Sequence, residues 1–168
     1  MLLFLRINNT YPKQKDFLAN KQCTRNQEIL IRNVFAGPSI GCFESCKFAL
    51  ERLDADKRKF CGDYVLFISS LVQHPYFVDG LLAMGFDPNK QFNGTGRFSV
   101  YNGKTPLHAA CQNGDIEIVK KLLDDDRTEV NLVNPYDGNN ALMYASAEGH
   151  SEIVDLLLRR KVDLNTKN

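Results

Sequence analysis

The chain carries one pattern twice: residues 103–110 read GKTPLHAA, and residues 138–145 read GNNALMYA. Five pairs of identical residues keep this register, each pair 35 positions apart: Gly103 and Gly138, Gly114 and Gly149, Ile118 and Ile153, Val119 and Val154, Leu123 and Leu158. A fixed offset is typical of stacked repeats, in which each unit buries its apolar face only against its neighbours. Such an array usually presents a binding surface and not a catalytic pocket.

Each copy of the pattern predicts two short helices joined by a tight turn. Thr105 can cap the first helix, and Pro106 suits its first turn. Gly114 ends this helix, and Asp115 is placed to cap the second one. In the second copy we expect Ser151 to be the corresponding cap. The apolar face of the second helix of the first copy is formed by Ile116, Val119, Leu122 and Leu123.

Residues 103–165 resemble the ankyrin repeat family, which has a period of about 33 residues and a Thr-Pro-Leu-His-x-Ala marker. The marker is intact at residues 105–110, whereas residues 140–143 of the second copy replace its first four positions. The resemblance implies an all-α, ankyrin-like helical repeat stack (an α-solenoid) with hairpin-like turns. It also implies that His108 makes structural hydrogen bonds within the stack, together with Thr105.

A degenerate unit without the marker is predicted upstream of these two copies. Val78 and the pair Leu81-Leu82 align with Val119 and Leu122-Leu123. We expect its first helix over residues 64–72, and we expect Pro75 to open the second one.

The connection that follows this unit is long. Thirteen residues separate Asn89 from Gly103, against six between Asn131 and Gly138. The dipeptide Asn93-Gly94 inside it is a strong turn signal. We therefore predict a long projecting loop at residues 90–102.

The N-terminal region is predicted to be helical after an irregular start. Apolar pairs at i, i+4 spacing predict a helix over residues 26–35. Phe43, Cys46, Leu50 and Leu53 form a second stripe, which predicts a helix carried on to about Lys59. These helices are either a further eroded repeat or a separate helical cap.

The expected organisation has five segments: an irregular arm at 1–23, a helical cap or eroded repeat at 24–61, a degenerate repeat at 62–102 with its projecting loop at 90–102, an ankyrin-like repeat at 103–137, and a second such repeat, truncated, at 138–168. Leu156, Leu157 and Leu158 lie on the last predicted helix with nothing after them to cover the stack. We expect missing repeats of a longer array, or a partner, to cover this end.

Composition is that of a soluble globular protein, with 43% hydrophobic and 24% charged residues. The net charge of +1 gives no general field to attract nucleic acid or an anionic membrane. The basic runs at 57–59 and 159–161 lie at predicted helix ends, where cations are favourable. Five cysteines, an odd count, indicate a reducing compartment, so we expect a cytoplasmic protein, with the nucleus as the alternative.

No cofactor, metal or catalytic site is expected. Gly103-Lys104-Thr105 lacks the upstream glycine of a phosphate loop. Cys42, Cys46 and Cys61 lack the second close pair of ligands that a zinc site needs, and we expect them to fill apolar space. His108 and Cys111 have no identifiable third group to orient them, so the chain is not expected to be an enzyme.

The function expected from the resemblance is protein–protein interaction, as a scaffold or adaptor that contacts a partner through its turn tips and inner helices. No small-molecule substrate, nucleic acid or membrane is expected. The alternative is a regulatory or substrate-recruiting fragment of a longer signalling or ubiquitin-pathway enzyme whose catalytic domain is absent here. Mapped onto this sequence, the expected partner-binding residues are Tyr101, Asn102, Lys104, Gln112, Asn113, Tyr136, Asp137, Asn139, Ala147 and Glu148.

Among these residues, Tyr101 and Tyr136 are the preferred anchors, because tyrosine combines a large contact area with one polar end. The alternative for both is packing between adjacent turns. Phe92, Phe98 and Val100 in the long loop either pack back on the stack or meet a partner.

Overall fold

The computed structural model describes residues 43–94 and 96–160. The predictions for the arm at 1–23, the helix over 26–35 and residues 161–168 lie outside the described residues. The described part forms α4 (Phe43–Glu51), α5 (Ala55–Leu71), α6 (Pro75–Ala83), the 3₁₀ helix η1 (Gly96–Tyr101), α7 (Pro106–Asn113), α8 (Ile116–Asp124), α9 (Ala141–Ala147) and α10 (Ser151–Arg159).

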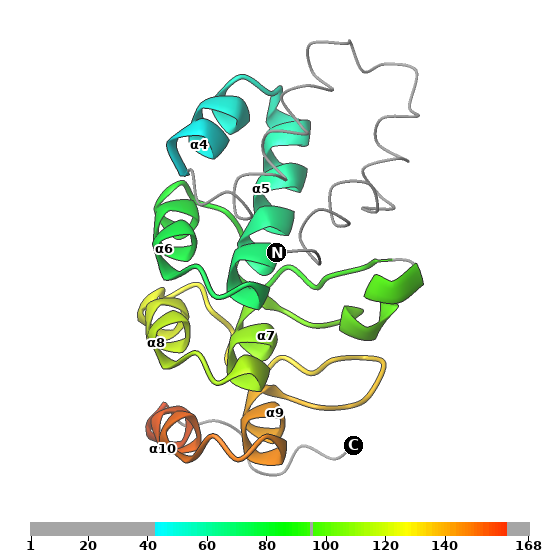
Figure 1. The fold of residues 1–168 in the computed structure, drawn as a ribbon, viewed down its shortest axis with the longest axis vertical. Coiled ribbons are helices and arrows are strands. Elements are labelled where there is room, and N and C mark those ends of the chain that lie inside the picture. The colour runs from blue at the N-terminus through cyan, green and yellow to red at the C-terminus, as the bar shows by residue number, and fades with distance from the viewer. Residues whose placement is uncertain (1–42, 95, 161–168) are drawn as a thin grey trace.

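The helices stand in two columns (Figure 1). An inner column contains α5, α7 and α9, and an outer column contains α4, α6, α8 and α10. Each inner helix and the outer helix that follows it form one unit, so the stack has the units α5–α6, α7–α8 and α9–α10. The predicted all-α repeat stack is confirmed.

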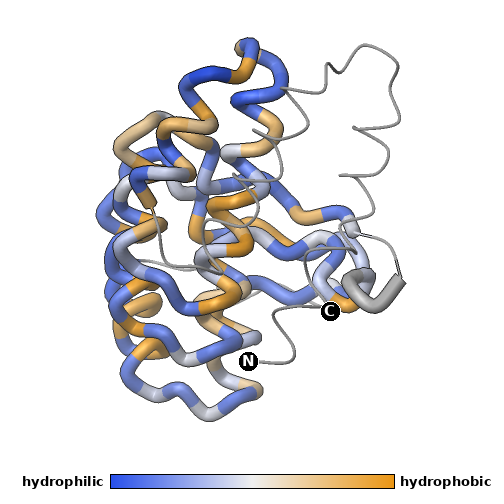
Figure 2. The backbone as a smooth tube through the Cα atoms, turned by 45° about the horizontal axis from the view of Figure 1, so that its top comes forward, coloured by the Kyte–Doolittle hydropathy of each residue, from blue (hydrophilic) through white to orange (hydrophobic). Residues whose placement is uncertain are grey.

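Amphipathic helices hold the columns together. In α8, Ile118, Val119 and Leu122 are fully buried, whereas Glu117 and Lys120 on the other face are exposed. Figure 2 shows the same alternation of hydrophobic and hydrophilic stretches along the helices. Burial of each such aliphatic side chain stabilises the stack by about 1.5–3 kcal/mol.

The helix ends of the α7–α8 unit follow the predicted local signals. The Thr105 side chain accepts from the backbone N–H of His108, and Asp115 accepts from that of Ile118. Gly114 ends α7 with φ of 75°, in the left-handed region. The expected cap of the last helix is wrong: Ser151 is its first residue, and His150 occupies the cap position without a side-chain cap hydrogen bond.

The single helix predicted from residue 43 to about 59 is also wrong. The chain leaves α4 after Glu51 and begins α5 at Ala55, because Asp54 caps the new helix by accepting from the Lys57 N–H at 3.0 Å. The same helix starts nine residues before the predicted Tyr64, and it crosses the boundary expected between residues 61 and 62.

The first basic run accordingly lies at the start of a helix and not at its end. Arg58 donates to the carbonyl oxygens of Leu50 (3.0 Å) and Glu51 (2.8 Å) at the end of α4, and to that of Leu53 (3.2 Å) in the turn that follows. α4 packs on α5 and α6, so it continues the outer column upward.

The α5–α6 unit replaces the marker chemistry with aromatic packing. Gln73 has φ of 60° at the turn between its helices, the place that Gly114 and Gly149 take in the next units. Phe67 takes the position in this unit that His108 takes in the next one. Its ring stacks on that of Phe92, with the ring centroids 4.4 Å apart.

Two loops project from the inner side of the stack (Figure 1). We call residues 90–102 the finger and residues 133–140 the hairpin. At the finger base, Phe92 N–H donates to the Lys104 carbonyl, and Gly103 N–H donates to the Phe92 carbonyl, both at 2.8 Å. The hairpin is closed by an antiparallel bridge between Val133 and Asn140.

Candidate partner-binding face

The marker residues fix how the hairpin meets the inner helix. Thr105 N–H donates to His108 Nδ1 at 3.1 Å, so Nε2 carries the ring proton and donates to the Leu132 carbonyl at 2.9 Å. Burial lowers the pKa of His108 to about 4, which keeps the ring neutral. His108 therefore has the structural role that the resemblance implied.

The neighbouring Cys111 thiol is not available as a nucleophile. Cys111 is fully buried, and burial raises its pKa, so the nucleophilic thiolate is disfavoured. Because both ring nitrogens of His108 are engaged as well, these two residues do not form an accessible nucleophile and base.

Tyr101 and Asn102 contribute to the finger itself. The Tyr101 ring is half-buried, and its edge meets Phe67 and Phe92 at centroid distances of 6.4 and 6.5 Å. The Asn102 side chain accepts from the Gly94 N–H and so closes the finger across its width. Packing within the stack thus accounts for much of the Tyr101 surface.

Lys104 is not a surface residue, because only 6% of it is exposed. Its ammonium donates to Gln112 Oε1 at 2.6 Å and lies 4.7 Å from the Tyr144 ring centroid and 5.7 Å from that of Tyr101. Burial lowers the pKa of Lys104, and the nearby carboxylate of Asp137 partly offsets this effect.

The hairpin presents one large exposed aromatic side chain. Tyr136 is 68% exposed, and its backbone N–H donates to Asn134 Oδ1 at 3.0 Å. Asp137 is exposed too, and it accepts from the Asn139 N–H at 3.1 Å and from the Tyr144 hydroxyl at 2.6 Å. The tip is thereby tied to α9.

The ends of the inner helices give four more predicted residues. Asn113 donates to the Leu71 carbonyl at 2.8 Å, which bonds α7 to the preceding inner helix. Gln112 is half-buried beside Lys104. Ala147 and Glu148, at the end of α9, are exposed.

The structure gathers part of the predicted set around one point. The Lys104 ammonium donates a hydrogen bond to Gln112 and lies 5.7 Å from the centroid of the Tyr101 ring. It also interacts electrostatically with the carboxylates of Asp137 and Glu148. Asn102 and Asn113 instead make bonds inside the stack.

Sequence reasoning missed one residue of the face, Tyr144. Tyr144 stands 35 positions after Ala109 of the intact marker, so a large side chain takes the place of a small one. This difference between the two copies could have indicated its role. Its hydroxyl links Asn134 to Asp137 under the hairpin.

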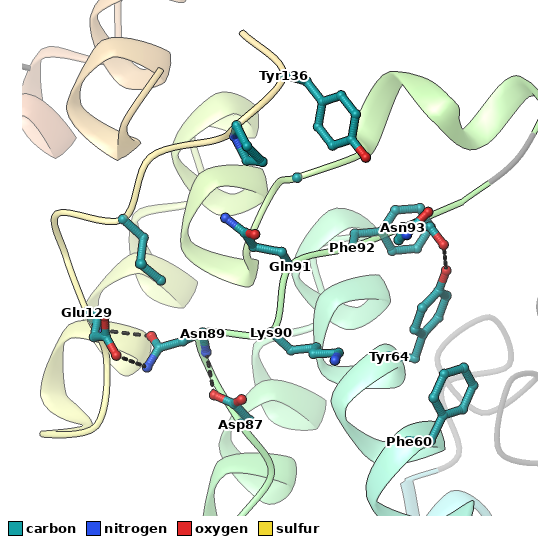
Figure 3. Close-up of a pocket in the computed structure, with 13 residues that line it drawn as sticks. Phe60, Tyr64, Asp87, Asn89, Lys90, Gln91, Phe92, Asn93, Glu129 and Tyr136 are labelled. Carbon is teal, nitrogen blue, oxygen red and sulfur yellow. Dashed lines mark hydrogen bonds between the residues drawn. The ribbon is translucent and has the colours of Figure 1, made fainter. Parts of the chain in front are cut away.

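A groove of about 560 Å³ runs between the finger base and the loop that leads to the hairpin (Figure 3). Asn89 spans it, donating to the Arg127 carbonyl at 2.7 Å and accepting from the Glu129 N–H at 2.8 Å. Gln91 donates to the Val133 carbonyl at 3.1 Å. These polar groups are thus used to join neighbouring loops.

Residues 43–94 and 96–160 contain no group of three or more His, Cys, Asp or Glu side chains that could hold a metal ion. Within the same residues, no helix has the length and apolar character needed to span a membrane.

Comparisons with known proteins match short parts of much longer chains. The chain is 42% identical over 64 residues to an ankyrin repeat protein of Rickettsia felis, 43% identical over 63 residues to the probable E3 ubiquitin-protein ligase XBOS33 of Oryza sativa subsp. japonica, and 28% identical over 106 residues to human NF-kappa-B inhibitor alpha. These matches cover 38%, 37% and 61% of this chain, but only 16%, 12% and 31% of the relatives.

A family model covers most of the chain. The model for ankyrin repeats (3 copies) matches residues 34–134 and 66–168, which includes all the described helices. The two columns, the Thr105–His108 cap and the projecting hairpin agree with that match. The chain belongs to the ankyrin repeat family, whose repeats are protein-interaction modules.

Proposed function

We propose that this chain is a scaffold or adaptor that binds a partner protein through its hairpin and the exposed ends of its inner helices. The observation that carries the proposal is Tyr136, a large aromatic side chain 68% exposed on the hairpin tip. Val100 in the finger is 66% exposed, which adds a second apolar group on a projecting loop. Exposed tyrosine is a common anchor of protein interfaces.

Rigidity of the hairpin supports this role. Asn134 is almost fully buried and donates to the Tyr144 hydroxyl at 2.7 Å, and that hydroxyl donates to Asp137. The chain of hydrogen bonds anchors the tip to α9 before any partner arrives. A pre-ordered surface loses less conformational entropy on binding, which favours affinity.

A second candidate is a regulatory or substrate-recruiting part of a longer signalling or ubiquitin-pathway enzyme. It is supported by the 43% identity to a probable E3 ubiquitin-protein ligase, of which the match covers 12%. Sequencing of the full transcript tests it. An open reading frame that continues past Asn168 into a catalytic domain would favour this candidate, and a stop codon at that point would count against it.

Site-specific photo-crosslinking tests the proposed face. A photoreactive amino acid is placed at Tyr136, and a control variant carries it at Glu117, which is exposed on α8 in the outer column. We expect partner proteins in a cell extract to crosslink at position 136 and not at position 117. Equal crosslinking at both positions, or crosslinking at 117 alone, would contradict the proposal.

A further inference from the structure

The charge of the proposed face comes from few residues. The inner helices α7 and α9 contain no Asp, Glu, Lys or Arg, so they contribute no formal charge. The predicted face then has three charged side chains: Lys104, Asp137 and Glu148. Their arrangement decides which charge a partner meets.

The one cation of this set is enclosed. The Lys104 ammonium lies between the rings of Tyr101 and Tyr144 and donates to Gln112 Oε1 at 2.6 Å, with 6% of the residue exposed. A partner group therefore cannot reach the ammonium directly, although its positive charge still offsets part of the negative charge of the nearby carboxylates.

The two carboxylates are in the opposite situation. Asp137 and Glu148 are both exposed. The Asp137 carboxylate and the Lys104 ammonium both contact Tyr144, and Glu148 follows Tyr144 by one helical turn. Both carboxylates therefore offset part of the fall in the pKa of Lys104 that burial causes. Asp137 belongs to the hairpin and Glu148 to the end of α9, so they approach the same ammonium from two elements. The three side chains together have a net negative charge, and only the two carboxylates among them are exposed.

We propose that the face around Lys104 selects partner segments that carry an arginine or lysine side chain, which would pair with Glu148 and Asp137 and lie against the exposed Tyr136 ring. This rests on the proposed function, because it specifies the chemistry of the partner that the face binds. A cation gains from the carboxylates and from the tyrosine face, and arginine gains most because its planar group also stacks.

Glu148 is the better residue to change first. Its side chain makes no hydrogen bond among the described residues, whereas Asp137 accepts from Tyr144 and Asn139. Glu148→Gln therefore removes the charge and keeps the hairpin bonds. Glu152→Gln is the matched control, because Glu152 is also exposed but lies on α10 in the outer column.

The test selects peptides from a random library displayed on phage against the full chain, and then measures the affinity of the selected synthetic peptides. We expect arginine and lysine to be enriched, affinity to weaken about fivefold in Glu148→Gln, and affinity to fall as salt is raised. Glu152→Gln should bind like the wild type.

Two failures are told apart by the variant Tyr136→Ala. Peptides whose affinity does not change in Tyr136→Ala bind elsewhere, and this result would overturn the proposed face itself. Peptides that lose affinity in Tyr136→Ala but lack basic residues, or that bind Glu148→Gln unchanged, would overturn only the preference for a cation.

Discussion

Gly114 joins α7 to α8 in a left-handed conformation that favours glycine. Its φ is 75°, and a Cβ built there would lie 2.5 Å from Cε1 of His150. Gly149 has φ of 76° at the equivalent turn, but a Cβ there would meet nothing within 4 Å. An alanine would adopt the same unfavourable backbone conformation at either position, but only at position 114 would its Cβ also clash with a side chain.

We predict that Gly114→Ala lowers the free energy of unfolding by more than Gly149→Ala does. The left-handed backbone costs each variant roughly 1 kcal/mol, and displacement of His150 adds about 1–2 kcal/mol at position 114. Urea unfolding of both variants measures the difference. Equal losses would mean that His150 yields without cost.

His108 makes the stability of the stack depend on pH. Its folded pKa of about 4 lies below the ordinary value of 6.5, because burial disfavours the charged ring. Between these values the unfolded chain binds a proton that the folded chain does not, so stability is full above about pH 6.5 and falls as the pH drops toward 4. Protonation would also place a proton on Nδ1, against the N–H of Thr105.

We predict that the wild type loses roughly 2 kcal/mol more unfolding free energy than His108→Gln between pH 7.5 and pH 5. Urea unfolding at both pH values, for both proteins, gives the comparison. The variant should be less stable at pH 7.5 but less sensitive to acid. Parallel losses in the two proteins would show that other groups control the acid response.

At the scale of elements, the finger depends on one buried ring. Phe92 is 2% exposed and stacks on Phe67, with Tyr64 at 4.7 Å on another side. Phe92 holds the finger against its inner helix, as the hydrogen bond from His108 to the Leu132 carbonyl holds the next loop against α7. An apolar contact has replaced a polar one at the same place in the unit.

We predict that Phe92→Ala destabilises the chain by about 3 kcal/mol, because it leaves a cavity beneath the finger. Hydrogen exchange should show faster exchange at the Phe92 and Gly103 amides, which pair across the finger base. Val100→Ala is the control at 66% exposure, with an expected change within about 0.5 kcal/mol. A small loss for Phe92→Ala would mean that the finger holds itself without this ring.

The same elements show how far the sequence determined the fold. Thr105, Gly114 and Asp115 act through bonds to near neighbours, so their local pattern was enough to predict the α7–α8 unit. The break between α4 and α5 was missed because the apolar stripe continues past it. The Asp54 cap is as local as that of Asp115, so it was an available signal, whereas the Arg58 bonds reach back to the end of the previous helix and depend on how the turn is folded.

The candidate face was less predictable than the fold. Tyr101 and Tyr136 are 35 positions apart and look equivalent in the sequence. The structure separates them, because the 3₁₀ helix turns Tyr101 back onto Phe67 and Phe92 while Tyr136 stands on an open tip. Burial of Lys104 likewise depends on Tyr144, a residue from the next unit.

At the scale of the whole molecule, stability depends on how tightly each unit is joined to the next. Asn89 is the clearest joint, since one side chain bonds the α5–α6 unit to the loop after α8 through the Arg127 carbonyl and the Glu129 N–H. In a stack, each unit gains stability from its neighbours, so a weakened joint lowers cooperativity as well as total stability.

We predict that Asn89→Ala costs about 1–3 kcal/mol, because two bonds across the joint are lost and their backbone partners are left to solvent. It should also lower the dependence of unfolding on urea, as the first unit begins to unfold apart from the others. Asn139→Ala is the control. Asn139 lies within the hairpin and does not join the two units at this point, so we expect cooperativity to stay unchanged. Urea unfolding followed by circular dichroism and by hydrogen exchange in α6 and α8 separates the two effects. A loss of stability in Asn89→Ala with an unchanged slope and equal exchange in both helices would mean that the units remain coupled through their packed helices alone.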